Sequence, residues 1–407
     1  MDYPTLSPGE RDRRWQRLRD MMAEDGLDAL VVVGIKGREH FEAYVANEYI
    51  EGVAILPRQS EPVLLTWHPK MVIRRMGGKT DRSRFWIDDV RIGKYGPNTA
   101  AVLKERGLER GRIGVVGLEV PEPGCPEGIV PYPMWRAVIE GLPHAEFIDT
   151  TWRVRAIMVE KSAEEQVVLR HSAAIGERAA AAMLETVKPG ASEHRIYDAI
   201  QSAIHGAGAV PRDPFLIMTW GRDDLGWFEP HWTSAGGPPR TIEPGDVVMT
   251  EIFPAYAGLE TQQQMSVAVA PVEPVVEELG RTARRAYKAG LATLRPGITF
   301  EQLWSAMLEP VRALGGWTLT PMVHSLPLGW TGGMGFAPER MPEHLRRWNT
   351  MGVIGREPLV IRQGMSFALE PNACLGQRRM NVGGSVLVTE HGAEELNQLP
   401  NRMHVVG

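Results

Sequence analysis

Two glutamates and two histidines have the types and spacing expected of a chemical site. Glu251 ends the apolar stretch GDVVMTE and Glu370 ends GMSFALE, and each follows a glycine by six positions. His231 and His324 come before these strands, in the segments EPHW and MVHS. A carboxylate at the end of a buried strand is costly unless it is paired, hydrated or bound to a cation. Because histidine also titrates near neutrality, the four residues predict a site for acid–base or metal chemistry.

Neutral amides follow the first of these glutamates. The stretch LETQQQM carries Glu260 and then Gln262, Gln263 and Gln264. Side chains alternate between the two faces of a strand, so at most two of the three glutamines share the face of the site. Amides offer hydrogen-bond donors and acceptors without charge. The pattern therefore favours a site for a polar substrate over a site for a metal ion.

Tryptophans flank both histidines. Trp220, Trp227 and Trp232 lie around the first histidine, and Trp330 follows the second. Aromatic rings form the walls of pockets for flat or cationic ligands. Core packing is the alternative role for these rings. Salt bridges to nearby arginines, which include Arg379, are the alternative for the glutamates, and structural hydrogen bonds are the alternative for the histidines.

An internal repeat organises the carboxy-terminal half. VKPGASEHRIYDAIQSAI (187–204) aligns with LRPGITFEQLWSAMLEPV (294–311). Each segment has a helix end, a basic-Pro-Gly stop, a Ser or Thr cap and an amphipathic helix. A glycine-led strand that ends in glutamate follows each segment. Two similar halves related by a pseudo-twofold axis would bring the two glutamates and two histidines to one central cleft.

Helix and strand patterns divide the chain into two domains. Residues 9–25 predict an amphipathic helix, and LDALVVVG predicts a buried strand. A hairpin of VAILP and PVLLTW follows, and then two further helix–strand pairs. Ser162 lies three positions before Glu165, which predicts a capping box at the start of a long helix. We predict a small α/β domain over 1–154 and a second domain over 155–407.

Composition is that of a globular protein. A chain of 407 residues is long for one core, which favours two domains, and its 43% hydrophobic and 23% charged residues are ordinary. The net charge of −5 gives no reason to expect nucleic acid. Two cysteines are too few for a disulfide framework. No apolar run approaches about 18 residues and the first residues are too polar for a signal peptide, so we expect no membrane partner and a cytoplasmic location.

Several blocks resemble, in order and spacing, the creatinase, aminopeptidase P and methionine aminopeptidase superfamily, which has the pita-bread fold. These blocks are RRWQRLRDMMAEDGLDALVVVG, PGDVVMTEIFPAYAG, MVHSLPLG, RQGMSFALEP and GGSVLVTEHGAEELN. The resemblance covers most of the chain. It implies an α+β protein with a small α/β amino-terminal domain and a carboxy-terminal pita-bread domain, whose pseudo-twofold duplicated halves surround an antiparallel sheet. It also implies a homodimer in which the amino-terminal domain of one subunit closes the cleft of the other.

Metallopeptidases of this superfamily hold two metal ions with two Asp, one His and two Glu. The resemblance puts these positions at Glu251, Gln262, His324, Glu370 and Gly383. Two divalent cations need several anionic oxygens, and the glutamine and the glycine supply none. We therefore expect no metal ion and no other cofactor. A single ion held by the three remaining ligands is the alternative.

The metal-free branch of the superfamily, creatinase and its relatives, has a strand signature similar to EIFPAYAGLETQQQM. The resemblance implies that His231 handles the proton and that Glu370 is one of two carboxylates that hold a guanidinium. The other carboxylate falls on Gln264, which puts a guanidinium substrate in doubt. We predict a metal-independent hydrolase that cleaves a C–N bond of a small amidine, urea-like or amide substrate, with His231 as general acid and base.

The predicted site has further members. The predicted catalytic residues are His231, Glu370 and His324, the last as a second polar contact. The predicted substrate-binding residues are Glu251, Glu260, Gln262, Gln264, Trp232 and Trp330. Two alternative functions remain: a metal-dependent Xaa-Pro-type peptidase or lyase with a reduced metal site, and a non-catalytic peptide-binding protein. The expected partner of the enzyme is a small-molecule substrate.

Overall fold

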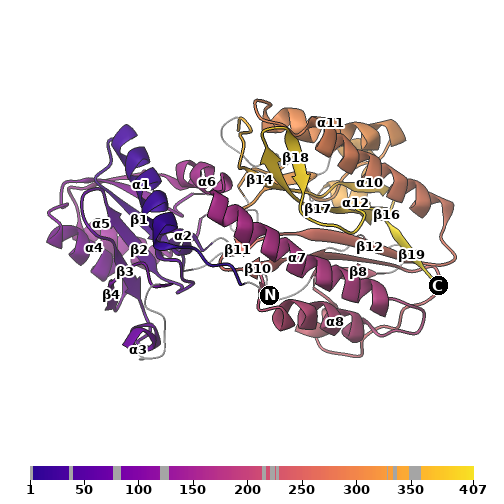
Figure 1. Ribbon diagram of the computed structural model, residues 1–407, viewed down its shortest axis with the longest axis horizontal. Coiled ribbons are helices and arrows are strands. Elements are labelled where there is room, and N and C mark those ends of the chain that lie inside the picture. The colour runs from indigo at the N-terminus through magenta and orange to yellow at the C-terminus, as the bar shows by residue number, and fades with distance from the viewer. Residues whose placement is uncertain are drawn as a thin grey trace. The chain divides into compact units, whose positions relative to one another are not determined.

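The computed structural model forms two compact units, Met1–Met158 and Val159–Gly407, which Figure 1 shows in indigo to magenta and in magenta to yellow. Among the helices of the described residues, none has the length and apolar character needed to cross a bilayer. The structure describes residues 3–35, 40–76, 84–119, 128–212, 217–220, 225, 229–327, 329–332, 337–347 and 359–407.

A six-stranded sheet lies at the centre of the amino-terminal unit. Its strand order is β4-β3-β2-β1-β5-β6. The pairs β1–β2 and β2–β3 are antiparallel, and the other neighbours are parallel. The predicted hairpin is therefore present as β2 and β3. The elements of this unit are α1 (Pro8–Glu24), β1 (Ala29–Val33), α2 (Phe41–Ala46), β2 (Val53–Pro57), β3 (Val63–Thr66), α3 (Lys70–Met76), β4 (Asp89–Ile92), α4 (Tyr95–Glu105), β5 (Arg112–Val116), α5 (Tyr132–Gly141), β6 (Glu146–Asp149) and α6 (Thr151–Val159).

The main sheet of the carboxy-terminal unit has the order β13-β14-β17-β12-β9-β8, and all neighbours in it are antiparallel. β18 pairs with β17, and β19 pairs with β12. The elements are α7 (Ala163–Thr186), α8 (Glu193–Gly206), β7 (Val210–Pro211), β8 (Ile217–Trp220), α9 (His231–Ser234), β9 (Val247–Ile252), β10 (Pro254–Tyr256), β11 (Leu259–Glu260), β12 (Gln263–Val269), α10 (Pro274–Thr293), α11 (Phe300–Leu314), β13 (Val323–Ser325), α12 (Glu343–Arg346), β14 (Ser366–Leu369), β15 (Asn372–Leu375), β16 (Arg378–Asn381), β17 (Gly383–Thr389), β18 (Gly392–Glu395) and β19 (His404–Val406).

The duplication predicted from the sequence is present in this sheet. Its strand order reads the same from both ends when β8, β9 and β12 are matched with β13, β14 and β17. The helix pair α7–α8 of the first half corresponds to α10–α11 of the second, shown in magenta and orange in Figure 1. The bridge Ser192–Thr241 before α8 has its counterpart in Thr299–Val360 before α11. A pseudo-twofold axis therefore passes between β12 and β17.

The helices cover one face of the main sheet. Val248 and Ile252 of β9, with Met265 and Val267 of β12, belong to a buried cluster with residues of α7 and α8. In the second half Phe367 of β14 stacks on Phe300 of α11, with ring centroids 6.1 Å apart. Side chains alternate along a strand, so the residues between these positions point to the opposite face. This second face carries the candidate site.

Candidate active site

Strand register places four site positions in one line across the sheet. Gln264 of β12 lies opposite Glu251 of β9 and opposite Gly383 of β17. Glu370 directly follows β14 and continues the pairing of that strand with β17, beside Gly383. Residues opposite one another on neighbouring strands share a face. The line therefore reads carboxylate, glycine, amide, carboxylate, and we call it the site row.

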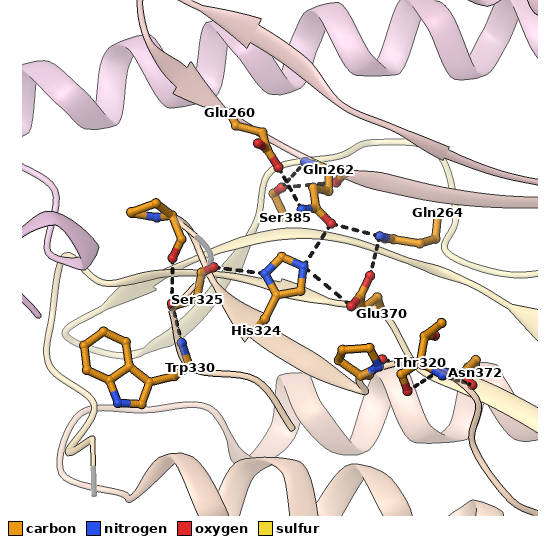
Figure 2. Close-up of polar contacts among 12 residues, drawn as sticks. Glu260, Gln262, Gln264, Thr320, His324, Ser325, Trp330, Glu370, Asn372 and Ser385 are labelled. Carbon is orange, nitrogen blue, oxygen red and sulfur yellow. Dashed lines mark hydrogen bonds and ion pairs between the residues drawn. The ribbon is translucent and has the colours of Figure 1, made fainter. Parts of the chain in front are cut away.

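Hydrogen bonds connect the site row to three further side chains (Figure 2). The Gln264 Nε2 amide donates to Glu370 Oε2 at 2.8 Å and to Gln262 Oε1 at 3.2 Å. The Gln262 Nε2 amide donates in turn to Glu260 Oε1 at 2.8 Å. The His324 Nε2 atom lies 3.1 Å from Gln262 Oε1 and 3.5 Å from Glu370 Oε1. Four of the residues predicted for substrate binding or catalysis therefore meet Glu370 or one another directly.

Both amides have one orientation that satisfies their neighbours. Turning the Gln264 amide would put its oxygen against the carboxylate of Glu370, and turning Gln262 would do the same at Glu260. The Gln262 oxygen therefore faces His324 Nε2, and the Ser325 carbonyl oxygen lies 2.9 Å from His324 Nδ1. Because both ring nitrogens face oxygen acceptors, the surroundings favour a His324 ring that donates from both.

An ion pair and a serine hold the outer end of this network. Arg212 Nε lies 3.4 Å from Glu260 Oε2, and the two side chains are only 7% and 13% exposed. The Gln262 backbone N–H donates to Ser385 Oγ at 2.7 Å, and that hydroxyl donates to the Gln262 carbonyl oxygen at 3.1 Å. Neither Arg212 nor Ser385 was predicted as part of the site. Their roles depend on which strands are neighbours, and local sequence carries no signal of that.

Gln263 lies on the other face of β12. Its Oε1 atom accepts a hydrogen bond from Asn397 Nδ2 at 3.0 Å, away from the site row. Gln262 and Gln264 share the site face, as the alternation of side chains predicted. Two of the three glutamines therefore belong to the site, and the third belongs to the structural core.

Arg379 is a buried cation close to the site row. It lies on β16, is 4% exposed, and its Nη2 donates to Thr320 Oγ1 at 3.0 Å. Burial lowers the pKa of the Arg379 guanidinium, and nearby groups that include Glu251 and Glu370 oppose that shift. Burial also raises the pKa of the neighbouring Cys374 thiol to about 12, which makes this cysteine a poor nucleophile. Sequence reasoning treated Arg379 only as a possible salt-bridge partner.

His231 stands at the exposed start of α9. Within the described residues its imidazole makes no hydrogen bond, and no hydrogen bond or ion pair joins it to the site row. The next residue, Trp232, packs its ring against His194 and Tyr197 of α8, with ring centroids 4.9 and 5.2 Å apart. The helix that carries His231 is therefore attached to α8 through Trp232.

Of the remaining tryptophans near the predicted site, the structure describes the side chain of Trp330 only. Trp330 is 5% exposed, and its backbone N–H donates to Ser325 Oγ at 3.2 Å, beside His324. This bond fixes the chain next to the site, as Figure 2 shows. Trp227 and the side chain of Trp220 lie outside the described residues.

Comparison with known proteins identifies the family. The model of metallopeptidase family M24 matches residues 168–390. Creatinase from Bacillus sp. is 23% identical over 414 residues, which cover 98% of this chain and 92% of that protein. Ectoine hydrolase from Halomonas elongata is 22% identical over 422 residues, which cover 97% of this chain and 96% of that protein. The solved X-Pro aminopeptidase from Thermotoga maritima has a TM-score of 0.73 at 17% identity and covers 96% of this chain and 99% of that chain.

The chain belongs to metallopeptidase family M24 and is a hydrolase with the pita-bread architecture. This result confirms the resemblance to the creatinase and aminopeptidase P superfamily. The α+β organisation, with duplicated halves around an antiparallel sheet, is confirmed as well.

The description of the family implies a metal centre, and the side chains present do not fit one. Gln262 and Gly383 provide no anionic oxygen at two of the five ligand positions. A Cβ atom added at Gly383 would lie 2.1 Å from the Leu369 carbonyl oxygen and 3.0 Å from Gln264 Oε1, so this position has no room for a ligand side chain. In the described part of the chain, no three His, Cys, Asp or Glu side chains gather as metal ligands do.

Proposed function

We propose that this protein is a hydrolase that cleaves a C–N bond of a small amidine, urea-like or amide substrate without a resident metal ion. One observation carries the proposal: the Gln264 amide extends past Gly383 and donates to Glu370 Oε2 at 2.8 Å. The carboxylate oxygen that a metal ion would need is thereby used by a neutral donor. The similarity to creatinase and ectoine hydrolase over nearly the whole chain supports a small substrate.

Hydrolysis of such a bond needs a base for the attacking water and an acid for the leaving nitrogen. The water oxygen bonds to the carbon, the C–N bond breaks, and a proton passes to the nitrogen. In the proposed mechanism, His231 takes the proton from water and delivers it to nitrogen, because its exposed imidazole is not engaged in another hydrogen bond within the described residues. Positioned acid–base catalysis of this kind contributes about 10²–10⁴-fold to the rate.

The buried network holds the reacting group in this proposal. His324 Nε2 lies 3.1 Å from Gln262 Oε1, and by exchanging this acceptor for the substrate it would stabilise oxygen that becomes negative during attack. Glu251 and Glu370, at the two ends of the site row, accept hydrogen bonds from substrate N–H groups. Gln262 and Glu260 extend this line of polar groups.

The test combines metal analysis with a substrate panel. The protein is purified without chelators, its metal content is measured, and turnover of amidines, ureas, amides and Xaa-Pro dipeptides is assayed with and without a chelator. We expect turnover of a non-peptide substrate that a chelator does not change. Chelator-sensitive cleavage of Xaa-Pro dipeptides with stoichiometric metal would instead establish the peptidase alternative, and failure to turn over any compound would favour the binding-protein alternative.

A further inference from the structure

Glu370, one of the two carboxylates of the site row, already has partners in the buried network. Glu370 faces the amide donor of Gln264 at 2.8 Å and the His324 ring nitrogen at 3.5 Å. Glu260 is paired with Arg212 at 3.4 Å, so this pair adds no net charge. Glu251, at the other end of the row, is 6% exposed and cannot rely on solvent to stabilise its charge.

Backbone contacts bring the strand of Arg379 over the site face. Ser266 lies two residues after Gln264 on β12 and therefore shares its face. The Ser266 hydroxyl donates to the carbonyl oxygen of Asn381, and the Asn381 backbone N–H lies 3.4 Å from that hydroxyl. Arg379 precedes Asn381 by two residues on β16 and points to the same side of its strand. Its guanidinium is buried within electrostatic reach of both Glu251 and Glu370.

We propose that Arg379 determines the charge of the group that this site accepts. Its guanidinium is a buried positive charge within electrostatic reach of the two carboxylates of the site row, and it offsets part of their negative charge. With Arg379 present, a divalent cation or an amidinium meets a like charge that the site cannot move away. A neutral amide or urea-like group meets only hydrogen-bond donors and acceptors. The inference rests on the proposed function for the kind of bond that is cleaved, and it narrows the substrate to one whose reacting group is uncharged.

Acetamide and acetamidinium test the inference because they share a shape and differ in charge. Their dissociation constants are measured on the full-length protein by NMR titration, with Mn²⁺ as a third probe. We expect the wild-type protein to bind acetamide at least about tenfold more tightly than acetamidinium, which corresponds to about 1.4 kcal/mol. We also expect no Mn²⁺ binding in the site. Arg379→Met should reverse the preference between the two organic probes.

The neighbouring residue provides a matched control. Arg378 carries the same charge on the same strand but pairs with Glu273 at 3.1 Å, and its side chain is 21% exposed. Arg378→Met should therefore keep the wild-type preference. Arg379→Lys keeps the charge and should keep the preference as well, which provides a second variant if Arg379→Met does not fold.

Three results would overturn the inference: tighter binding of acetamidinium or Mn²⁺ than of acetamide to the wild-type protein, no binding of acetamide at all, or an unchanged preference in a folded Arg379→Met protein. These measurements use binding and not turnover. A protein that prefers acetamide but hydrolyses no substrate would contradict the proposed function and leave this inference standing.

Discussion

The absence of a side chain at Gly383 is a strict requirement of the site row, and Gly383→Ala tests it. The added methyl carbon would lie 2.1 Å from the Leu369 carbonyl oxygen, 2.8 Å from Glu370 Cα and 3.0 Å from Gln264 Oε1. Because two of these atoms are backbone atoms, β14 and β17 must separate to relieve the contact. Overfilling a packed position costs about 1–3 kcal/mol. In a unit of this size each kcal/mol lowers the melting temperature by roughly 2–4 °C, so we expect a fall of roughly 2–12 °C.

Thermal unfolding followed by circular dichroism measures this effect. Gly206→Ala in α8 is the control, because a Cβ atom there meets nothing within 4 Å. The control should melt at or slightly above the wild-type temperature, since alanine favours a helix over glycine by about 0.5–1 kcal/mol. Equal melting temperatures for Gly383→Ala and wild type would refute the close approach. By the same reasoning Gly383→Glu, which restores the acid of the family pattern, should gain no Mn²⁺ binding.

Three further predictions concern the proton, the amide and a buried acid. His231→Ala should lower kcat by about 10²–10⁴-fold with an unchanged melting temperature, and near-wild-type turnover would remove this residue from the mechanism. Gln264→Glu places a second carboxylate against Glu370 and should destabilise the fold by about 1–3 kcal/mol near neutral pH. The loss should be smaller in acid, where one of the two carboxyls is protonated. An equal loss of unfolding free energy at both pH values would contradict this. Burial raises the pKa of the Glu193 carboxyl in the folded protein above its value in the unfolded chain. The stability that the bound proton provides is therefore present when the pH is below the unfolded-chain pKa, and it is lost as the pH rises through the folded-protein pKa. Glu193→Gln should therefore be the more stable protein near neutral pH, and denaturant titrations should show this advantage shrink in acid.

Much of the fold could be predicted because several local signals agree. The capping box at Ser162 and Glu165 is present at the start of α7, with bonds of 2.8 and 3.0 Å. The repeated cap at Thr299 is present before α11. In contrast, α6 was missed, because TWRVRAIMV has no clear amphipathic pattern, although the Asp149 carboxylate before it accepts a hydrogen bond from the Thr151 backbone N–H at 3.3 Å. Its helical form depends on tertiary packing, and Val154 within it is 1% exposed.

The candidate site was predictable to the extent that it follows from the repeat. Glu370, His324 and Gln264 come together because duplicated strands lie side by side in one sheet. Arg379 was not foreseen as a site residue, since its neighbours are set by how the β15–β16 hairpin folds over β12. Trp232 was expected to contact substrate, and its ring contacts instead belong to α8. Contacts between side chains on different elements are not encoded in local spacing.

The two central strands carry different side chains at the position where they face each other, and this difference affects how a molecule can bind there. Gln264 and Gly383 face each other across the pseudo-twofold axis, and one has a long polar side chain where the other has none. The backbone is nearly symmetric there, but the chemistry is not. Because the Gln264 amide extends past Gly383 to Glu370, a molecule placed on the axis meets the polar side chain of β12 and no free space over Gly383. A chiral substrate and its enantiomer would make different contacts with such a surface, so one hand of a racemic compound should be consumed faster than the other.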